Sequence, residues 1–196
     1  MLTAIVLAAG LSTRMGTANK LLLLYEGKAI IERTILNLLD AGIQEVIVVT
    51  GYEADKITMA VQYLPIRIIY NTAYEKGMTT SIQKGVASAN GKGYMVCLGD
   101  MYAITPEEYS VLKISFEEQV KLDEKCITIP RYNNEKGNPV IFAAAYKDAI
   151  LQHTDMEGCK AILQSNAAHI HWLEMNSQHI LEDLDYPEDY KKISNE

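Results

Sequence analysis

Four short apolar runs in the first half of the chain constrain its fold more than any other feature. They are nearly continuous in hydrophobicity over residues 4–7, 46–49, 66–69 and 95–98. Strands that are buried on both faces have this composition, which favours a parallel sheet between layers of helices. Apolar residues recur at helical spacing over 31–39 and 57–64, and residues 105–108 have the composition of a helix start. The alternation predicts an α/β fold with a doubly wound, mostly parallel sheet sandwiched by helices, and a ligand at the carboxyl ends of the strands.

The second half of the chain has a more varied pattern. We expect strands over residues 126–129, 139–142 and 170–173, helices over 143–151 and 157–163, and a polar loop over 131–138. No linker, repeat or low-complexity stretch separates the two halves. A chain of 196 residues usually forms one core. We therefore expect a single domain over residues 1–196.

Composition argues against several classes of protein. The formal net charge of -7 disfavours nucleic-acid binding, which needs a basic face. The three cysteines form no CxxC pair, so they predict neither a disulfide framework nor a zinc site. The apolar N-terminus lacks a basic flank and is interrupted at Gly10, unlike a signal peptide or a membrane span. We expect a cytoplasmic protein that binds neither nucleic acid nor membranes.

The stretch LAAGLSTRMGTANK, residues 7–20, directly follows the first expected strand and carries the clearest chemical signal. Its small residues Ala8, Ala9 and Gly10 leave backbone N–H groups open to a ligand. Arg14 offers a planar fork for phosphate oxygens, and Lys20 offers a compact charge. Loops of this kind hold nucleotide phosphates in α/β proteins. The spacing is neither that of a Walker A loop nor that of a GxGxxG fingerprint.

The pattern LAAGxSxRMGxxK resembles the signature of the MobA-like nucleotidyltransferases, and within them that of the molybdenum cofactor cytidylyltransferases. The resemblance implies a Rossmann-like nucleotidyltransferase fold. Residues 1–105 or so would form the nucleotide-binding half and about 106–196 the acceptor-binding half. It also implies catalytic roles for the two cations of the opening loop, Arg14 and Lys20. The loop residues that would contact the nucleotide are Leu7, Ala8, Ala9, Gly10, Arg14 and Lys20.

Two acidic positions point to a metal ion. Asp100 follows the fourth apolar run, where a carboxylate can hold magnesium, although a helix cap or an ordinary loop aspartate would have the same pattern. The family has a metal-binding aspartate at this place, which implies a catalytic role for Asp100; Tyr102 replaces the family's proline. The resemblance assigns the second metal ligand to Asp185, with Asp183 close by as the weaker candidate.

Two further segments match the family. KGMTTS, residues 76–81, has the composition of a loop that opens a helix, where plain helix capping is the alternative to anion binding. The resemblance implies base and ribose contacts there from Gly77, Thr80 and Ser81. KGNPV at 136–140 and EGCK at 157–160 resemble the family's pterin-side wall. This implies an acceptor-binding set of Lys136, Gly137, Asn138 and Lys160.

The resemblance implies transfer of a cytidylyl group from CTP to the terminal phosphate of molybdopterin, with Mg²⁺ as cofactor and pyrophosphate as the other product. A molybdoenzyme or its chaperone would receive the dinucleotide cofactor. Ala9 and the pair Thr80–Ser81 match the CTP-type segments rather than the GTP-type ones. The alternatives are GTP as donor, a sugar or alcohol phosphate as acceptor, and a catalytically silent nucleotide-binding module. An NAD-type oxidoreductase is disfavoured by the glycine spacing.

Overall fold

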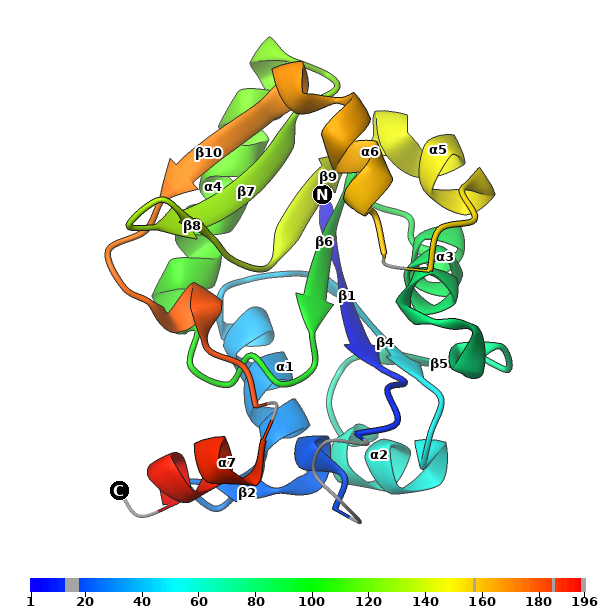
Figure 1. Cartoon of the computed structure of the whole chain (residues 1–196), viewed down its shortest axis with the longest axis vertical. Helices are drawn as coiled ribbons and strands as arrows, with labels where there is room; N and C mark the ends of the chain where they lie inside the picture. The colour runs from blue at the N-terminus through cyan, green and yellow to red at the C-terminus, as the bar shows by residue number, and fades with distance from the viewer. Residues whose placement is uncertain (13–17, 157, 185, 195–196) are drawn as a thin grey trace.

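The structure, a computed structural model, describes residues 1–12, 18–156, 158–184 and 186–194. Most of its strands belong to one eight-stranded sheet (Figure 1). The strands are β1 (Leu2–Ala8), β2 (Leu24–Tyr25), β3 (Lys28–Ala29), β4 (Glu45–Thr50), β5 (Arg67–Tyr70), β6 (Gly93–Leu98), β7 (Ile127–Tyr132), β8 (Glu135–Lys136), β9 (Val140–Ala143) and β10 (Ile170–Glu174). The sheet runs β10-β7-β9-β6-β1-β4-β5, β8 pairs only with β7, and β2 and β3 form a separate ribbon.

The four apolar runs of the first half form the predicted parallel strands. β1 lies between β4 and β6 and is parallel to both, and β5 extends the parallel array beyond β4. Ile5, Val6 and Ile47 have no exposed surface, because the two sheet faces are both covered. Because successive side chains of β1 and β4 point to opposite faces of the sheet and both faces are buried, these strands carry almost no polar residues. The fold class predicted from the sequence is therefore confirmed.

The second half adds one strand that reverses direction. β9 pairs antiparallel with both β6 and β7, and β7 is parallel to β10. The expectation of a polar loop over 131–138 is wrong in part, because β7 continues to Tyr132 and pairs antiparallel with β8. Asn133 and Asn134 both have positive φ and form the two-residue turn between these strands. Asparagine tolerates this conformation, and such turns match the twist of a hairpin.

Helices cover both faces of the sheet. They are α1 (Ile30–Asp40), α2 (Ala54–Val61), α3 (Met78–Ser88), α4 (Pro106–Leu122), α5 (Lys147–Gln152), α6 (Lys160–Ser165) and α7 (Pro187–Ser194). Short 3-10 turns are η2 (Lys20–Leu22), η3 (Tyr74–Lys76), η4 (Ala144–Tyr146), η5 (Ala167–His169) and η6 (His179–Leu181). α1 packs against α2 and α4, whereas α3 packs on β1 and β4 and against α5 (Figure 1). Among the described helices, none is long and apolar enough to cross a membrane.

Two helix boundaries in the second half differ from the prediction. The segment expected to be helical from residue 143 begins with the turn η4, and α5 follows at Lys147. The helix expected from residue 157 begins at Lys160. The predicted start of α4 is confirmed, since Thr105 caps it with Pro106 in the first turn. A reciprocal cap is a strong local signal, whereas the short helices depend on tertiary packing.

Candidate functional site

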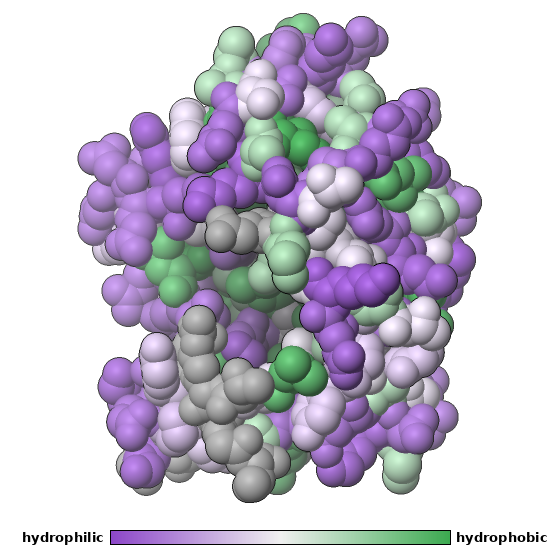
Figure 2. Space-filling model, turned by 45° about the vertical axis from the view of Figure 1, so that its right-hand side comes forward, coloured by the Kyte–Doolittle hydropathy of each residue, from purple (hydrophilic) through white to green (hydrophobic). Residues whose placement is uncertain are grey.

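A cavity of about 550 Å³ opens at the carboxyl ends of β1 and β6. A hollow near the centre of one molecular face is visible in Figure 2. Many of the residues expected at the site line the cavity: Leu7, Ala9, Gly10, Lys20, Gly77, Ser81, Asp100 and the weaker candidate Asp183. Arg14 and Asp185 lie outside the described residues. The topology thus brings together segments that are more than a hundred residues apart in the sequence.

Ala8 and Thr80 lie behind the cavity wall. Strand alternation directs Leu7 and Ala9 to the cavity and the intervening Ala8 into the core, where it is 2% exposed. The Thr80 hydroxyl is within 3.0 Å of the Gly77 and Ala73 carbonyl oxygens, to which it donates. The structure therefore gives Thr80 a role in shaping the turn before α3.

Lys20 and Asp100 form the charged centre of the cavity. Lys20 opens η2, which is capped by the Asn19 side chain, and Asp100 lies two residues beyond the end of β6. The Lys20 Nζ is 2.5 Å from Oδ2 of Asp100, and the two side chains are 20% and 5% exposed. The sequence predicts that Lys20 contacts nucleotide phosphates. The structure adds a second task, because this lysine also neutralises a buried carboxylate.

Asp183 approaches the same cavity from the segment between η6 and α7. Its neighbour Leu184 has no exposed surface and belongs to a small apolar cluster with Tyr102 and Ile30. This anchor holds Asp183 at the cavity rim. Tyr102, the departure from the family's proline, is therefore a core residue that joins the Asp100 turn to the Asp183 segment.

The donor set fits a hard divalent cation. Asp100 and Asp183 both line the cavity and bring carboxylate oxygens from two different segments, and carboxylate oxygens are ligands that Mg²⁺ prefers. Within the described residues, no three His, Cys, Asp or Glu side chains gather as a complete metal site. Magnesium usually completes its coordination with water and substrate phosphates. Two carboxylates alone would leave most of the coordination sphere of such a cation to water or to a ligand.

The turn before α3 closes one wall of the cavity. Gly77 has a φ of +106°, and a Cβ there would lie 3.0 Å from the Met156 carbonyl oxygen. The buried Asn71 side chain donates to Thr80 Oγ1 at 2.9 Å and to Ser81 Oγ at 3.0 Å. Asn71 was missed in the sequence, although a polar residue directly after β5 at the carboxyl edge of the sheet is a usable signal.

Gly51 is a second residue that the sequence analysis missed. It follows β4, and a Cβ at this position would lie 2.6 Å from Tyr74 Cβ and 2.8 Å from Ala9 Cβ. Tyr74 and Ala9 both line the cavity. Glycine at residue 51 therefore lets two wall segments approach each other closely.

The residues expected to bind the acceptor form a separate group next to the cavity. Burial of Lys136 is the main cause that lowers its pKa, and the charge of nearby Lys160 lowers the pKa further. Gly137 packs tightly on Ile180 of η6, where a Cβ would lie 2.6 Å from the Ile180 Cδ1. The Asn138 N–H donates to the Ile180 carbonyl oxygen at 3.0 Å. None of the four acceptor candidates lines the cavity, but Gly158, two residues before Lys160, lies against Met78 of its wall.

Comparison with known proteins adds to the geometry. Residues 4–171 match the MobA-like NTP transferase domain. A nicotine blue oxidoreductase of Paenarthrobacter nicotinovorans is 24% identical, over 97% of this chain and 95% of that protein. A probable molybdenum cofactor guanylyltransferase of Methanosarcina mazei is 31% identical, over 70% of this chain but only 61% of that protein. A solved nucleotidyl transferase from Methanothermobacter superimposes with a TM-score of 0.84 at 23% identity, covering 100% of this chain and 96% of that one.

Proposed function

We propose, because the chain belongs to the MobA-like NTP transferase domain family, that it transfers a cytidylyl group from CTP to the terminal phosphate of molybdopterin and releases pyrophosphate. The observation that carries the proposal is the Lys20–Asp100 pair at the carboxyl ends of β1 and β6. A cation for phosphates and a carboxylate for a metal ion lie side by side in one cavity. Phosphoryl and nucleotidyl transfer need such positioning and charge neutralisation more than covalent chemistry.

The residues of the opening loop would hold the triphosphate. Ala9 and Gly10 line the cavity, so their backbone N–H groups would be the donors to phosphate oxygens. Lys20, together with Arg14, would offset the charge of the departing pyrophosphate. Asp100, with Asp185 or Asp183, would hold the divalent cation. That cation supplies positive charge to the phosphate oxygens when it is bound. No general base is required, because a phosphate nucleophile is already ionised.

The charges of Lys136 and Lys160 favour an acceptor that carries a phosphate group. The pKa of Lys136 is lowered first by burial and then by the neighbouring Lys160 charge, so the protonated form of Lys136 is disfavoured where it stands. A bound phosphate dianion would favour that protonated form. Both ammonium groups act as point charges, without the two-pronged geometry of arginine. This arrangement suits a terminal phosphate and leaves the rest of the acceptor to other contacts.

The CTP preference rests on the tight wall around Ala9. Ala9 lines the cavity and packs beside Gly51, so its methyl group takes room that a larger base would need. One methyl group of misfit is worth about 1–3 kcal/mol, roughly a 10–200-fold preference. The Methanosarcina relative is named a guanylyltransferase, which makes GTP the second candidate donor. We expect Ala9→Gly combined with Thr80→Ala and Ser81→Gly to raise kcat/KM for GTP relative to CTP.

A matrix of CTP and GTP against molybdopterin and simple sugar or alcohol phosphates, with Mg²⁺ and a pyrophosphate readout, tests the proposal. We expect release with CTP and molybdopterin, and a kcat about 10²-fold lower for Asp100→Asn. Asp55→Asn on the exposed side of α2 is the matched control. Pyrophosphate release with GTP but not with CTP would refute CTP as the donor. Release with a sugar or alcohol phosphate but not with molybdopterin would refute molybdopterin as the acceptor. Nucleotide binding without release identifies a silent module, and NAD(P)H oxidation without release identifies an oxidoreductase.

We place this reaction in the cytoplasm and propose a molybdoenzyme or its chaperone as the recipient of the product. Cys97, Cys126 and Cys159 are free and buried, which suits a reducing compartment. Co-purification of the chain with a molybdoenzyme under gentle conditions would support the recipient.

A further inference from the structure

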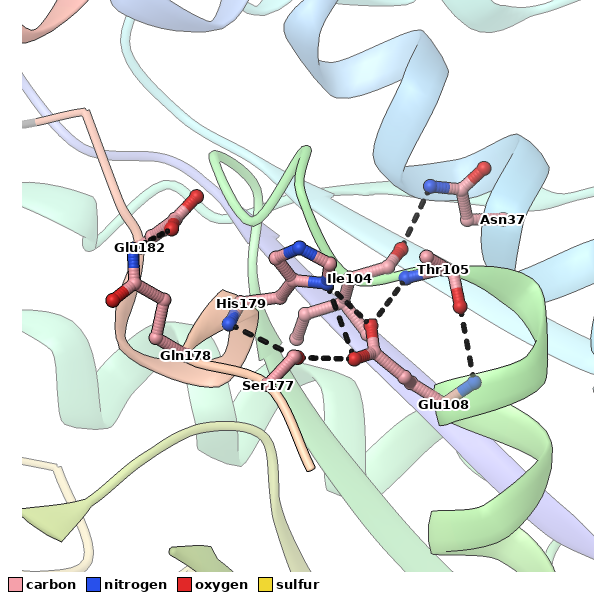
Figure 3. A network of polar contacts seen from close by, with 8 residues as sticks. All are labelled: Asn37, Ile104, Thr105, Glu108, Ser177, Gln178, His179 and Glu182. Carbon is pink, nitrogen blue, oxygen red and sulfur yellow. Dashed lines mark hydrogen bonds and ion pairs between the residues drawn. The ribbon is translucent and has the colours of Figure 1, made fainter. Parts of the chain in front are cut away.

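Glu108 lies at the centre of a polar network at the start of α4 (Figure 3). One side of its carboxylate completes the cap of α4: Oε2 accepts from the Thr105 N–H at 2.8 Å, and the Glu108 N–H donates to Thr105 Oγ1 at 3.3 Å. The other side reaches a distant segment. Ser177 Oγ donates to Oε1, and His179 Nδ1 lies 3.0 and 3.1 Å from the two carboxylate oxygens. One side chain therefore joins the start of α4 to the turn η6.

The two segments joined by Glu108 both lead to the acidic residues of the cavity. α4 begins where the connection from Asp100 ends, and Asp183 follows η6 after one intervening residue. The Asn37 side chain donates to the Ile104 carbonyl oxygen at 2.8 Å and fixes the first connection to α1 (Figure 3). The relative position of the two carboxylate-bearing segments thus depends on the Glu108 network, together with the Tyr102–Leu184 packing.

The charge state of Glu108 suits this task. Burial opposes ionisation, but the bonds from Ser177, the Thr105 N–H and His179 hold the pKa of the Glu108 carboxyl below its ordinary value. An ionised carboxylate offers both of its oxygens as acceptors to donors from the two segments, whereas protonation turns one oxygen into a donor. Glu108 does not line the cavity, so it acts on the site through the segments that it joins.

We propose that Glu108 is a positioning residue, whose contacts with Ser177 and His179 hold the Asp183 segment against the Asp100 turn and so set the affinity of the cavity for a divalent cation. The proposal rests on the metal site of the proposed function. Helix capping alone would explain the Thr105 contacts but not those to η6. The two arms of the network can therefore be separated by mutation.

Mn²⁺ titration of the full chain in the presence of CTP, followed by the electron paramagnetic resonance signal of free Mn²⁺, tests the proposal. Ser177→Ala combined with His179→Ala removes the η6 arm and leaves the helix cap intact. Thr105→Ala, the matched control, removes the cap hydroxyl and leaves the η6 arm. Outer contacts that orient metal ligands are typically worth about 10–100-fold in metal affinity. We expect the Mn²⁺ Kd of the double variant to rise at least about tenfold, and that of Thr105→Ala to stay unchanged although its melting temperature falls.

Three outcomes would count against the proposal. An unchanged Mn²⁺ Kd in the folded double variant overturns the positioning role alone and leaves the metal site in place. An equal loss of affinity in the Thr105→Ala control shows that general stability of α4 is responsible. If the wild-type chain binds no Mn²⁺ with CTP, the metal site of the proposed function fails, and the role of Glu108 fails with it.

Discussion

Replacing Lys20 with methionine tests whether the charged centre is an ion pair that a metal can replace. Removing one partner of a fully buried pair costs about 3–5 kcal/mol, whereas an exposed pair is worth about 0.2–1 kcal/mol. The Asp100 side chain is 5% exposed and that of Lys20 is 20% exposed, beside a cavity of about 550 Å³. We therefore expect an intermediate loss, about 1–3 kcal/mol. For a chain of this length that corresponds to a fall in Tm of about 2–12 °C.

The same reasoning predicts a specific pattern of rescue. Methionine keeps much of the lysine's apolar stem, so the loss is largely that of the charge. Combining Lys20→Met with Asp100→Asn should recover much of the lost stability, because no carboxylate then remains without its partner. Mg²⁺ should raise the Tm of Lys20→Met more than that of the wild-type chain, since the cation replaces the missing charge.

Thermal and urea unfolding of the two single variants and the double variant give the coupling free energy of the pair. Lys56→Met is the matched control, because Lys56 pairs with Glu53 on the exposed surface. We expect the control to change the unfolding midpoint very little. Strictly additive effects of Lys20→Met and Asp100→Asn, or a Tm of Lys20→Met equal to that of the control, would refute the ion-pair argument.

Three further changes probe the surrounding structure. Gly51→Ala should destabilise the chain by about 1–3 kcal/mol in urea unfolding, because its Cβ would meet Tyr74 at 2.6 Å; unchanged stability would show that the wall adjusts freely. Asn71→Ala should raise the KM for nucleotide, because it removes the bond that orients Ser81, and an unchanged KM would remove that role. The pKa of Glu108 is lowered from its ordinary 4.5, so its contribution to stability is present above that pH and is lost as the pH falls through the folded-state pKa. Glu108→Gln should therefore flatten the dependence of the unfolding free energy on pH in this acid range. An unaltered acid-unfolding profile would contradict this assignment.

Local patterns in the sequence were enough to predict the parallel half of the sheet and the start of α4. The runs that became β1, β4 and β6 are apolar because both of their faces are buried, and that requirement is visible one strand at a time, whereas the edge strand β5 is only half-buried. Thr105 and Glu108 satisfy a helix terminus within four residues of sequence. The loop after β1 was likewise recognisable, since its small residues and cations stand in one continuous stretch.

Only the tertiary structure decided how the site is assembled. The reversal of β9, the contact between Lys20 and Asp100, and the arrival of Asp183 beside them join segments separated by long stretches of chain. No local propensity encodes such contacts, because they follow from the order in which strands enter the sheet. The second role of Glu108 also depends on tertiary structure. Its cap on α4 involves residues that are neighbours in the sequence, whereas its bonds to Ser177 and His179 form because the chain brings η6 to that helix end. Local hydrogen bonding and burial could be predicted from the sequence, while the distances between charges depended on the packing of the whole chain.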